Sequence, residues 1–143
     1  MYKTCSRCGK IHDFNKSCYR NQKAKGLTDA DKFRKTYRWH KKSEDIRTRD
    51  KHLCRCCLAD IYNTYNQFNF SKLSVHHIVP LEEDYSLRLD DDNLITLCDY
   101  HHKLAENNVI RRYILKLLTN PDANLVEIRE KVEGLNIPPT QKV

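Results

Sequence analysis

Residues 74–81 read SVHHIVPL, with two adjacent histidines between apolar residues and before a proline. Successive side chains of a strand point to opposite faces, so Val75 and His77 face one way and His76 the other. One imidazole is then partly buried, which is costly unless a partner binds or hydrogen-bonds it. Two interpretations follow: a satisfied core histidine beside an exposed one, or a metal ligand beside a general base.

The composition indicates one small globular protein. The chain has 143 residues, of which 39% are hydrophobic and 31% charged, enough for a single domain with a modest core. Three glycines and four prolines exclude collagen-like and Pro/Gly-rich disordered classes. The first ten residues lack the apolar segment of a signal peptide, and charges interrupt the most apolar stretch, 109–118. We therefore expect a cytoplasmic protein without a membrane partner.

The positive charge is concentrated in the N-terminal third. The formal net charge is +7, and residues 1–50 hold 15 Lys/Arg and 6 Asp/Glu, giving +9, which leaves −2 for the rest. Such a surface on a soluble protein favours a polyanionic partner, nucleic acid above all, although a solvated helix surface is the alternative. Before the cysteine cluster of residues 54–57, Arg47, Arg49 and Lys51 are candidate phosphate contacts.

Three of the seven cysteines and one nearby histidine have the spacing of metal ligands. Without a secretion signal a disulfide framework is not expected. Cys54 and Cys57 form Cys-x-x-Cys, and Cys98 and His101 form Cys-x-x-His, which together predict a tetrahedral zinc site. The alternatives are ordinary buried cysteines, or Cys56 in the place of Cys57, although the two-residue spacer favours Cys57.

The N-terminal residues hold a second, weaker metal pattern. Cys5, Cys8, His12 and Cys18 have the composition of a zinc knuckle, with the histidine one residue early. Zinc there would fix a small basic lobe able to contact backbone phosphates. The alternative is an arm with unused thiols.

Local patterns predict the order of helices and strands. Thr28, with Asp31 three residues later, caps the first helix, and Trp39 on it is predicted to pack in the core. His102 follows His101 on a later helix, so it points about 100° away and can face the strand with the histidine pair. The predicted elements are a helix over 27–50, loops over 61–72 and 81–93, strands over 73–80 and 94–97, a helix from 98 that extends or restarts over 109–120, and a last helix over 123–133 capped by Gly134.

Several segments in this order resemble the HNH endonucleases of the ββα-metal superfamily. The segments are HLCRCC, VHHIVPL and DNLITLCDYHHK, within residues 50–105. The resemblance implies an α+β fold, a small zinc-stabilised ββα-metal (HNH) core with flanking helices and an N-terminal zinc-knuckle-like basic arm. We expect the arm over 1–26, the nuclease domain with its leading helix over 27–120, and a C-terminal helix and tail over 121–143.

The resemblance also implies roles for individual residues. His77 matches the general base, Asn93 the residue that orients it, and His76 and His102 the ligands of a catalytic divalent cation. The structural zinc set is Cys54, Cys57, Cys98 and His101. The expected activity is metal-dependent hydrolysis of DNA phosphodiester bonds, by nicking or duplex cleavage, leaving a 5′-phosphate and a 3′-hydroxyl. The expected DNA contacts are Arg38, Lys41, Lys42, Arg47, Arg49 and Lys51.

The cofactors and further partners follow from the same resemblance. We expect one or two structural Zn²⁺ ions and a catalytic Mn²⁺, Ni²⁺, Mg²⁺ or Zn²⁺. Two imidazole ligands favour Mn²⁺ or Ni²⁺ over Mg²⁺. Upstream, CSRCGKIHD and YRWHKKSEDIRTRD are similar to short bacteriophage HNH nucleases, which implies double-stranded DNA in the host cytoplasm and a packaging role beside terminase or portal proteins. The alternative is a catalytically inactive, zinc-stabilised DNA-binding or packaging-complex module.

Overall fold

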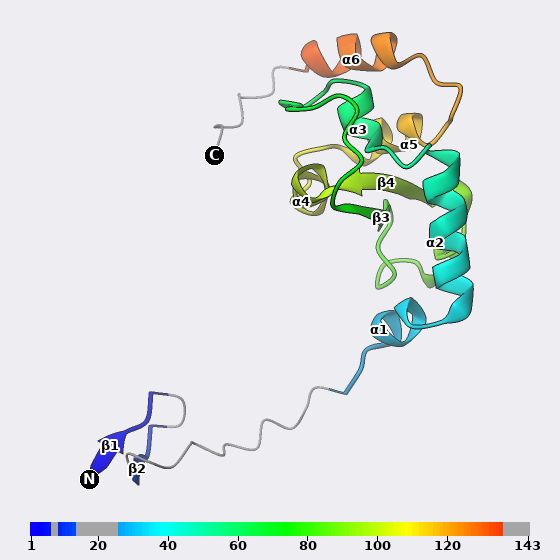
Figure 1. Ribbon diagram of the computed structural model, residues 1–143. Helices are drawn as coiled ribbons and strands as arrows, with labels where there is room; N and C mark the ends of the chain where they lie inside the picture. Colours follow the sequence, from blue (N-terminus) through cyan, green and yellow to red (C-terminus); the bar gives the residue numbers. More distant parts are fainter. Residues whose placement is uncertain (7–8, 14–25, 136–143) are drawn as a thin grey trace.

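The computed structural model describes residues 1–6, 9–13 and 26–135 (Figure 1). Near the N-terminus, β1 (Tyr2–Thr4) pairs antiparallel with β2 (Ile11–Asp13). Of the residues predicted to form a second zinc site, Cys5 and His12 flank or belong to this hairpin, whereas Cys8 and Cys18 lie outside the described residues. The N-terminal zinc site therefore stays a prediction.

The helix predicted over 27–50 is two helices, α1 (Asp29–Arg34) and α2 (Tyr37–Arg49). The predicted cap is confirmed, because Thr28 and Asp31 bond reciprocally in a capping box. The single long helix was wrong, and Thr36 explains the break. Its hydroxyl donates to Phe33 O (2.7 Å) and accepts from the backbone N–H of Trp39 (3.2 Å). One side chain thus satisfies the last turn of α1 and the first turn of α2.

A two-stranded antiparallel hairpin, β3 (Leu73–His77) and β4 (Leu94–Cys98), lies at the centre of the molecule (Figure 1). The predicted strand is confirmed, but it ends at His77 rather than at Pro80. After His77 the chain turns away, and the N–H of Val79 donates to the Asn93 side chain instead of to a strand. The connection contains two short 3₁₀ turns, η1 (Tyr85–Leu87) and η2 (Asp91–Asn93).

The register assigns the two histidines to opposite faces of the hairpin. His76 lies opposite Ile95, and His77 lies opposite Leu94. Directly opposed residues of an antiparallel pair share a face. His77 and Leu94 therefore face the helices α1 and α2, whereas His76 and Ile95 face α4. The alternation predicted from the sequence is confirmed.

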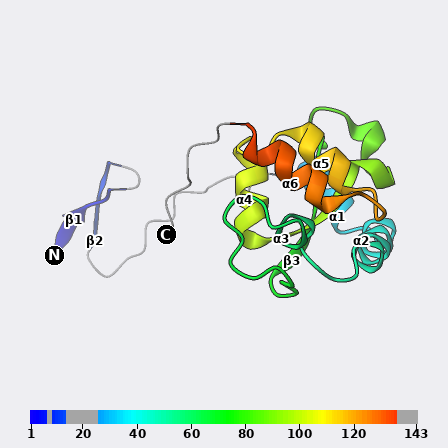
Figure 2. The ribbon, with the colours of Figure 1, turned by 90° about the horizontal axis from the view of Figure 1, so that it is seen from above.

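Each face of the hairpin is covered by its own apolar cluster. Figures 1 and 2 show the helices that carry most of these residues. The larger cluster joins β4 to α3 (Arg55–Leu58), α4 (Asp99–Glu106), α5 (Arg112–Leu118) and α6 (Leu125–Glu133). The smaller cluster includes Phe33, Trp39, Ile46 and Val75, so the predicted core position of Trp39 is confirmed. Gly134 caps α6 as predicted.

The stretch 109–118 restarts as a helix of its own. Asn108 has a positive φ of 56°. This left-handed conformation follows the end of α4 and redirects the chain before α5 begins. The buried residues of α5 are Ile114, Leu115 and Leu118, whereas Tyr113 and Leu117 are exposed. Within the described residues, no helix has the length and apolarity to cross a bilayer.

Asp50 joins α2 to the central hairpin. Its carboxylate is fully buried, and it accepts the backbone N–H of Thr96 in β4 at 2.9 Å. Arg49 donates to the same carboxylate from Nε (2.8 Å) and Nη2 (3.0 Å), and also to the carbonyl of Leu94 (2.8 Å). A buried carboxylate is stable only when its oxygens accept hydrogen bonds, and these bonds hold the face of the hairpin that carries His77 against α2.

Candidate active site and metal centre

The four residues of the predicted zinc set converge on one buried point. One ligand atom each of Cys54, Cys57, Cys98 and His101 lies within 4.8 Å of the others. A tetrahedral zinc site places sulfurs roughly 3.8 Å apart and sulfur and nitrogen roughly 3.6 Å apart. The Sγ atoms of Cys57 and Cys98 are 3.8 Å apart, and His101 Nδ1 lies 3.2–3.5 Å from three sulfurs. The donor set therefore fits a zinc-sized cation.

The tautomer of His101 also fits this ligand set. Its Nε2 lies 3.0 Å from the carbonyl of Ile61, and a carbonyl can only accept, so Nε2 carries the proton. The lone pair of Nδ1 then faces the sulfurs, as in metal-binding histidines. Although burial lowers the pKa of His101, hydrogen bonds with Cys54 and Cys98 raise it to about 10. The sulfurs of Cys54 and Cys98 therefore stabilise a positive charge at Nδ1, where a bound cation would take the place of a second ring proton.

Cys56 has a different place from its two neighbours. It is fully buried in the larger apolar cluster and is not part of the four-residue set. Burial raises the pKa of its thiol, so it stays protonated. The arrangement therefore favours Cys57 over Cys56 as the ligand.

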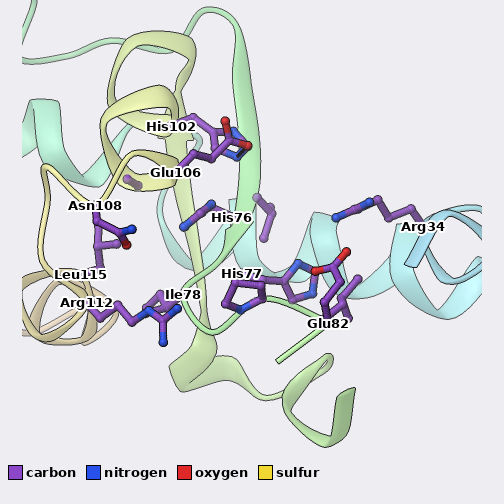
Figure 3. Close-up of a pocket in the computed structure, with 14 residues that line it drawn as sticks. Arg34, His76, His77, Ile78, Glu82, His102, Glu106, Asn108, Arg112 and Leu115 are labelled. Atoms are coloured by element: carbon purple, nitrogen blue, oxygen red, sulfur yellow. Dashed lines mark ion pairs between the residues drawn. The ribbon is translucent and has the colours of Figure 1, made fainter. Parts of the chain in front are cut away.

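A cavity of about 500 Å³ runs along the free edge of β3 (Figure 3). Within the described part of the chain, β3 pairs with β4 alone, so its other edge is open. Consecutive residues from Val75 to Ile78 line the cavity. A ligand at a strand edge can reach side chains from both faces, which brings His76 and His77 into one site although they point to opposite sides.

His76 and His102 meet on the α4 side of this cavity. Their ring centroids are 4.9 Å apart, in an edge-to-face arrangement. Burial, followed by the neighbouring His102, His77 and Arg112, lowers the pKa of His76 to about 4. The imidazole is therefore neutral at physiological pH, which is the form that binds a metal.

Two further polar side chains lie against His102. Ser74 Oγ is 2.7 Å from its Nδ1, and Glu106 Oε1 is 3.2 Å from its Nε2. A histidine that binds a metal through Nε2 donates its Nδ1–H to an oxygen, and Ser74 is in that position. Two ligands about 2.1 Å from one cation lie roughly 3 Å apart in an octahedral arrangement, close to the separation of Glu106 and His102.

His77 lies in the smaller cluster on the other side of the hairpin. Its ring stacks on Trp39, with centroids 4.6 Å apart and planes at 23°, and meets the edge of Phe33 at 6.2 Å. Its Nε2 lies 3.1 Å from the carbonyl of Arg88, so that nitrogen carries the proton and Nδ1 keeps its lone pair. Burial is the main reason why the pKa of His77 is lowered, which keeps the ring neutral.

Asn93 holds the ends of the connecting loop together. Its Oδ1 accepts the N–H of Val79 (2.7 Å), and its Nδ2 donates to the carbonyls of Val79 (3.2 Å) and Leu87 (3.3 Å). Asn93 is buried, and these bonds join it to the backbone of the loop, whereas Nε2 of His77 meets the carbonyl of Arg88. Asn93 fixes the loop that carries the Arg88 carbonyl, and so acts on His77 through the backbone.

The six residues predicted to contact DNA differ in how they are bound within the protein. Arg49 donates from all three guanidinium nitrogens to protein acceptors and is mostly buried. Lys42 pairs with Asp91 at 2.7 Å, whereas Lys41 and Arg47 form longer pairs along α2. Arg38 and Lys51 are exposed. The DNA contacts of these six residues stay predictions. The hydrogen bonds of Arg49 within the protein indicate a structural role for this residue.

The sequence interpretation missed Ser74, Glu106 and the carbonyl of Arg88. Glu106 follows His102 by four residues, a spacing that puts both side chains on one helical face. Ser74 precedes His76 by two residues and shares its strand face. Both spacings are present in the sequence and could have identified Glu106 and Ser74 as neighbours of His102 and His76. The Arg88 carbonyl could not be identified in this way, because any backbone carbonyl in the loop 78–93 could have reached His77.

The comparisons with known proteins agree with this arrangement. Residues 54–108 match the family model described as HNH endonuclease. A crystal structure of the HNH endonuclease of the deep-sea thermophilic bacteriophage GVE2, with manganese ion, is similar at 32% identity, covering 59% of this chain and 85% of that chain, with a TM-score of 0.47. No curated protein matches. Residues 54–108, the segment that holds the four-residue zinc set, His76, His77 and His102, thus match an HNH endonuclease domain.

Proposed function

We propose that this protein is a divalent-metal-dependent endonuclease that hydrolyses phosphodiester bonds of double-stranded DNA. The observation that carries the proposal is the common cavity of His76, His77 and His102, all within the residues that match the HNH endonuclease family model. The expected products are a 5′-phosphate and a 3′-hydroxyl. A single chain has one such cavity among its described residues, so nicking of one strand is the expected elementary reaction.

His77 is the proposed general base. Its Nε2–H is bonded to the Arg88 carbonyl, so Nδ1 is the nitrogen that takes a proton from the attacking water. The low pKa keeps this nitrogen unprotonated at neutral pH. Trp39 stacks on the ring and limits its rotation, which holds the base in one orientation.

His76, His102 and Glu106 are the proposed holders of the catalytic cation. Their nitrogen and oxygen donors suit Mn²⁺ and related ions, and the carboxylate adds a harder ligand than the two imidazoles. A cation held there would supply positive charge to the scissile phosphate and to the leaving oxygen. Ser74 orients His102 for this task, and the basic surface of α1 and α2 is the proposed guide for the DNA backbone.

The Cys54, Cys57, Cys98 and His101 set is the proposed structural zinc site. It joins α3 to the junction of β4 and α4, and its buried position away from the cavity gives no access to substrate. A packaging role beside terminase or portal proteins, as in phage enzymes of this kind, is part of the proposal that awaits its own test.

The decisive experiment compares three proteins on supercoiled plasmid with added Mn²⁺. The native protein should give nicked and then linear DNA, and His77→Ala should give neither. His40→Ala, which removes an exposed histidine from α2, is the matched control and should cut like the native protein. Equal zinc content by elemental analysis verifies folding. Equal cleavage by His77→Ala would contradict the assigned base, and an inactive native protein would favour the DNA-binding module.

A further inference from the structure

Arg112 and Glu83 form a two-pronged ion pair at the wall of the cavity. Arg112 Nη1 donates to Glu83 Oε1 at 2.8 Å, and Nη2 donates to Oε2 at 2.6 Å. Arg112 begins α5, and Glu83 lies in the loop that follows β3. Arg112 lines the same cavity as His76 and His102 (Figure 3).

We propose that Arg112 binds a DNA phosphate next to the scissile bond, and that Glu83 occupies its guanidinium until DNA arrives. The inference rests on the proposed function, because it assigns a substrate contact to the same cavity. The family match covers Glu83 but not Arg112, which lies beyond residues 54–108, so the match does not include the pair.

The exposure of the pair argues against a mainly structural purpose. The side chains of Arg112 and Glu83 are 43% and 54% exposed, and ion pairs in water contribute little to stability. Arginines that stabilise the fold of this protein are buried, in contrast to this pair. Arg55, for example, is buried and donates to the carbonyls of Leu118 and Asn120.

The geometry of the pair is that of phosphate recognition. A guanidinium donates two parallel hydrogen bonds to a carboxylate or to a phosphate in the same way, so a carboxylate can stand in for a phosphate. Because both side chains reach solvent, the exchange of Glu83 for a phosphate oxygen pair needs no movement of the core. The bonds broken to Glu83 are replaced by equivalent bonds to DNA.

The position of Arg112 suits a phosphate beside the reacting one. Its charge is close enough to help lower the pKa of His76, after the larger effects of burial, His102 and His77. In Figure 3, Arg112 and Arg34 lie on either side of His76 and His77. A backbone that crosses the cavity would thus meet a guanidinium on each side of the proposed metal and base.

Glu83 is expected to act as a competitor for DNA. Its negative charge, beside the cavity-lining Arg112, repels phosphates, and its bonds to Arg112 must be replaced before Arg112 can bind one. Removing the charge of Glu83 should therefore strengthen DNA binding, and should do so only while Arg112 is present. If the ion pair were only structural, substitution of either residue would lower the stability of the protein, and removal of the Glu83 charge would not strengthen DNA binding through Arg112.

The test measures binding of a fluorescently labelled DNA duplex by anisotropy, without added divalent ion, over a series of salt concentrations. Arg112→Ala should weaken binding several-fold and reduce the slope of log K against log[salt] by about 1. Arg111→Ala is the matched control, because it removes the same charge from the adjacent exposed residue, which does not line the cavity. Glu83→Gln should bind more tightly than the native protein, and should lose this gain in the Arg112→Ala background.

Two results would overturn the inference: equal binding losses in Arg112→Ala and Arg111→Ala, or a gain from Glu83→Gln that persists without Arg112. Thermal unfolding of each variant checks that binding differences do not come from loss of fold. The plasmid assay separates this inference from the proposed function. A native protein that binds DNA through Arg112 without cutting it contradicts the function alone, whereas His77-dependent cutting with an unimportant Arg112 contradicts the inference alone.

Discussion

Trp39 and His77 are stacked, with ring centroids 4.6 Å apart, although they come from a helix and a strand 38 positions apart in the chain. The contact makes the smaller apolar cluster part of the proposed catalytic apparatus. Phe33 completes the packing, since it touches both rings. The two-helix arrangement of α1 and α2 therefore positions the proposed base as well as core residues.

Trp39→Leu should keep an apolar side chain beside His77 but remove the flat surface on which the ring rests. We expect kcat on plasmid DNA to fall about ten- to hundredfold with little change in KM, because misplaced catalytic groups slow the chemical step. Tyr37→Leu, which changes an exposed aromatic residue of the same helix, is the control and should leave kcat unchanged. Equal effects of the two substitutions would contradict a positioning role for Trp39.

Asp50→Ala should destabilise the protein by about 3 kcal/mol or more, since it leaves Arg49 and the N–H of Thr96 without their buried acceptor. Chemical denaturation with constant zinc measures this change. Asp45→Ala removes an exposed carboxylate of α2 that pairs with Lys41 at 3.7 Å, and should change the unfolding free energy by about 0.5 kcal/mol or less. A similar small cost for Asp50→Ala would show that the buried carboxylate does not hold α2 to β4.

Cys57→Ser should lose the structural zinc, whereas Cys56→Ser should keep it. Both thiols are buried, but only Cys57 belongs to the converging set, so the pair separates ligation from packing. Elemental analysis gives the zinc content, and thermal unfolding with and without a chelator gives its effect on stability. If Cys56→Ser lost zinc and Cys57→Ser kept it, the ligand assignment would be reversed.

Glu106→Gln should weaken Mn²⁺ binding at least about tenfold, because an amide oxygen is a poorer cation ligand than a carboxylate. Isothermal titration calorimetry without DNA measures this directly. The loss should be larger for Mg²⁺ than for Ni²⁺, since the remaining imidazoles are the softer ligands. Glu82→Gln, in the same cavity but beside His77, is the control. Unchanged Mn²⁺ affinity would leave Glu106 as a hydrogen-bond partner of His102 only.

Features with a short sequence period were predictable, and features made by distant contacts were not. The opposite orientation of His76 and His77 follows from the alternation of a strand, and the Cys54 to His101 set follows from its two knuckle spacings. The break at Thr36 was missed because a threonine inside a charged helical pattern does not reveal whether its hydroxyl will cap a new helix. The role of Asp50 depends on Thr96, 46 residues away.

The separation of the two metal sites depends on one helical step. His101 is bonded within the buried thiol set, and the next residue, His102, faces the cavity with Ser74 and Glu106. Inserting or deleting a single residue in the first turn of α4 would rotate every later side chain by about 100° and aim a different one at each site. The spacing from Cys98 to Glu106 is therefore fixed by the need to serve both proposed sites at once.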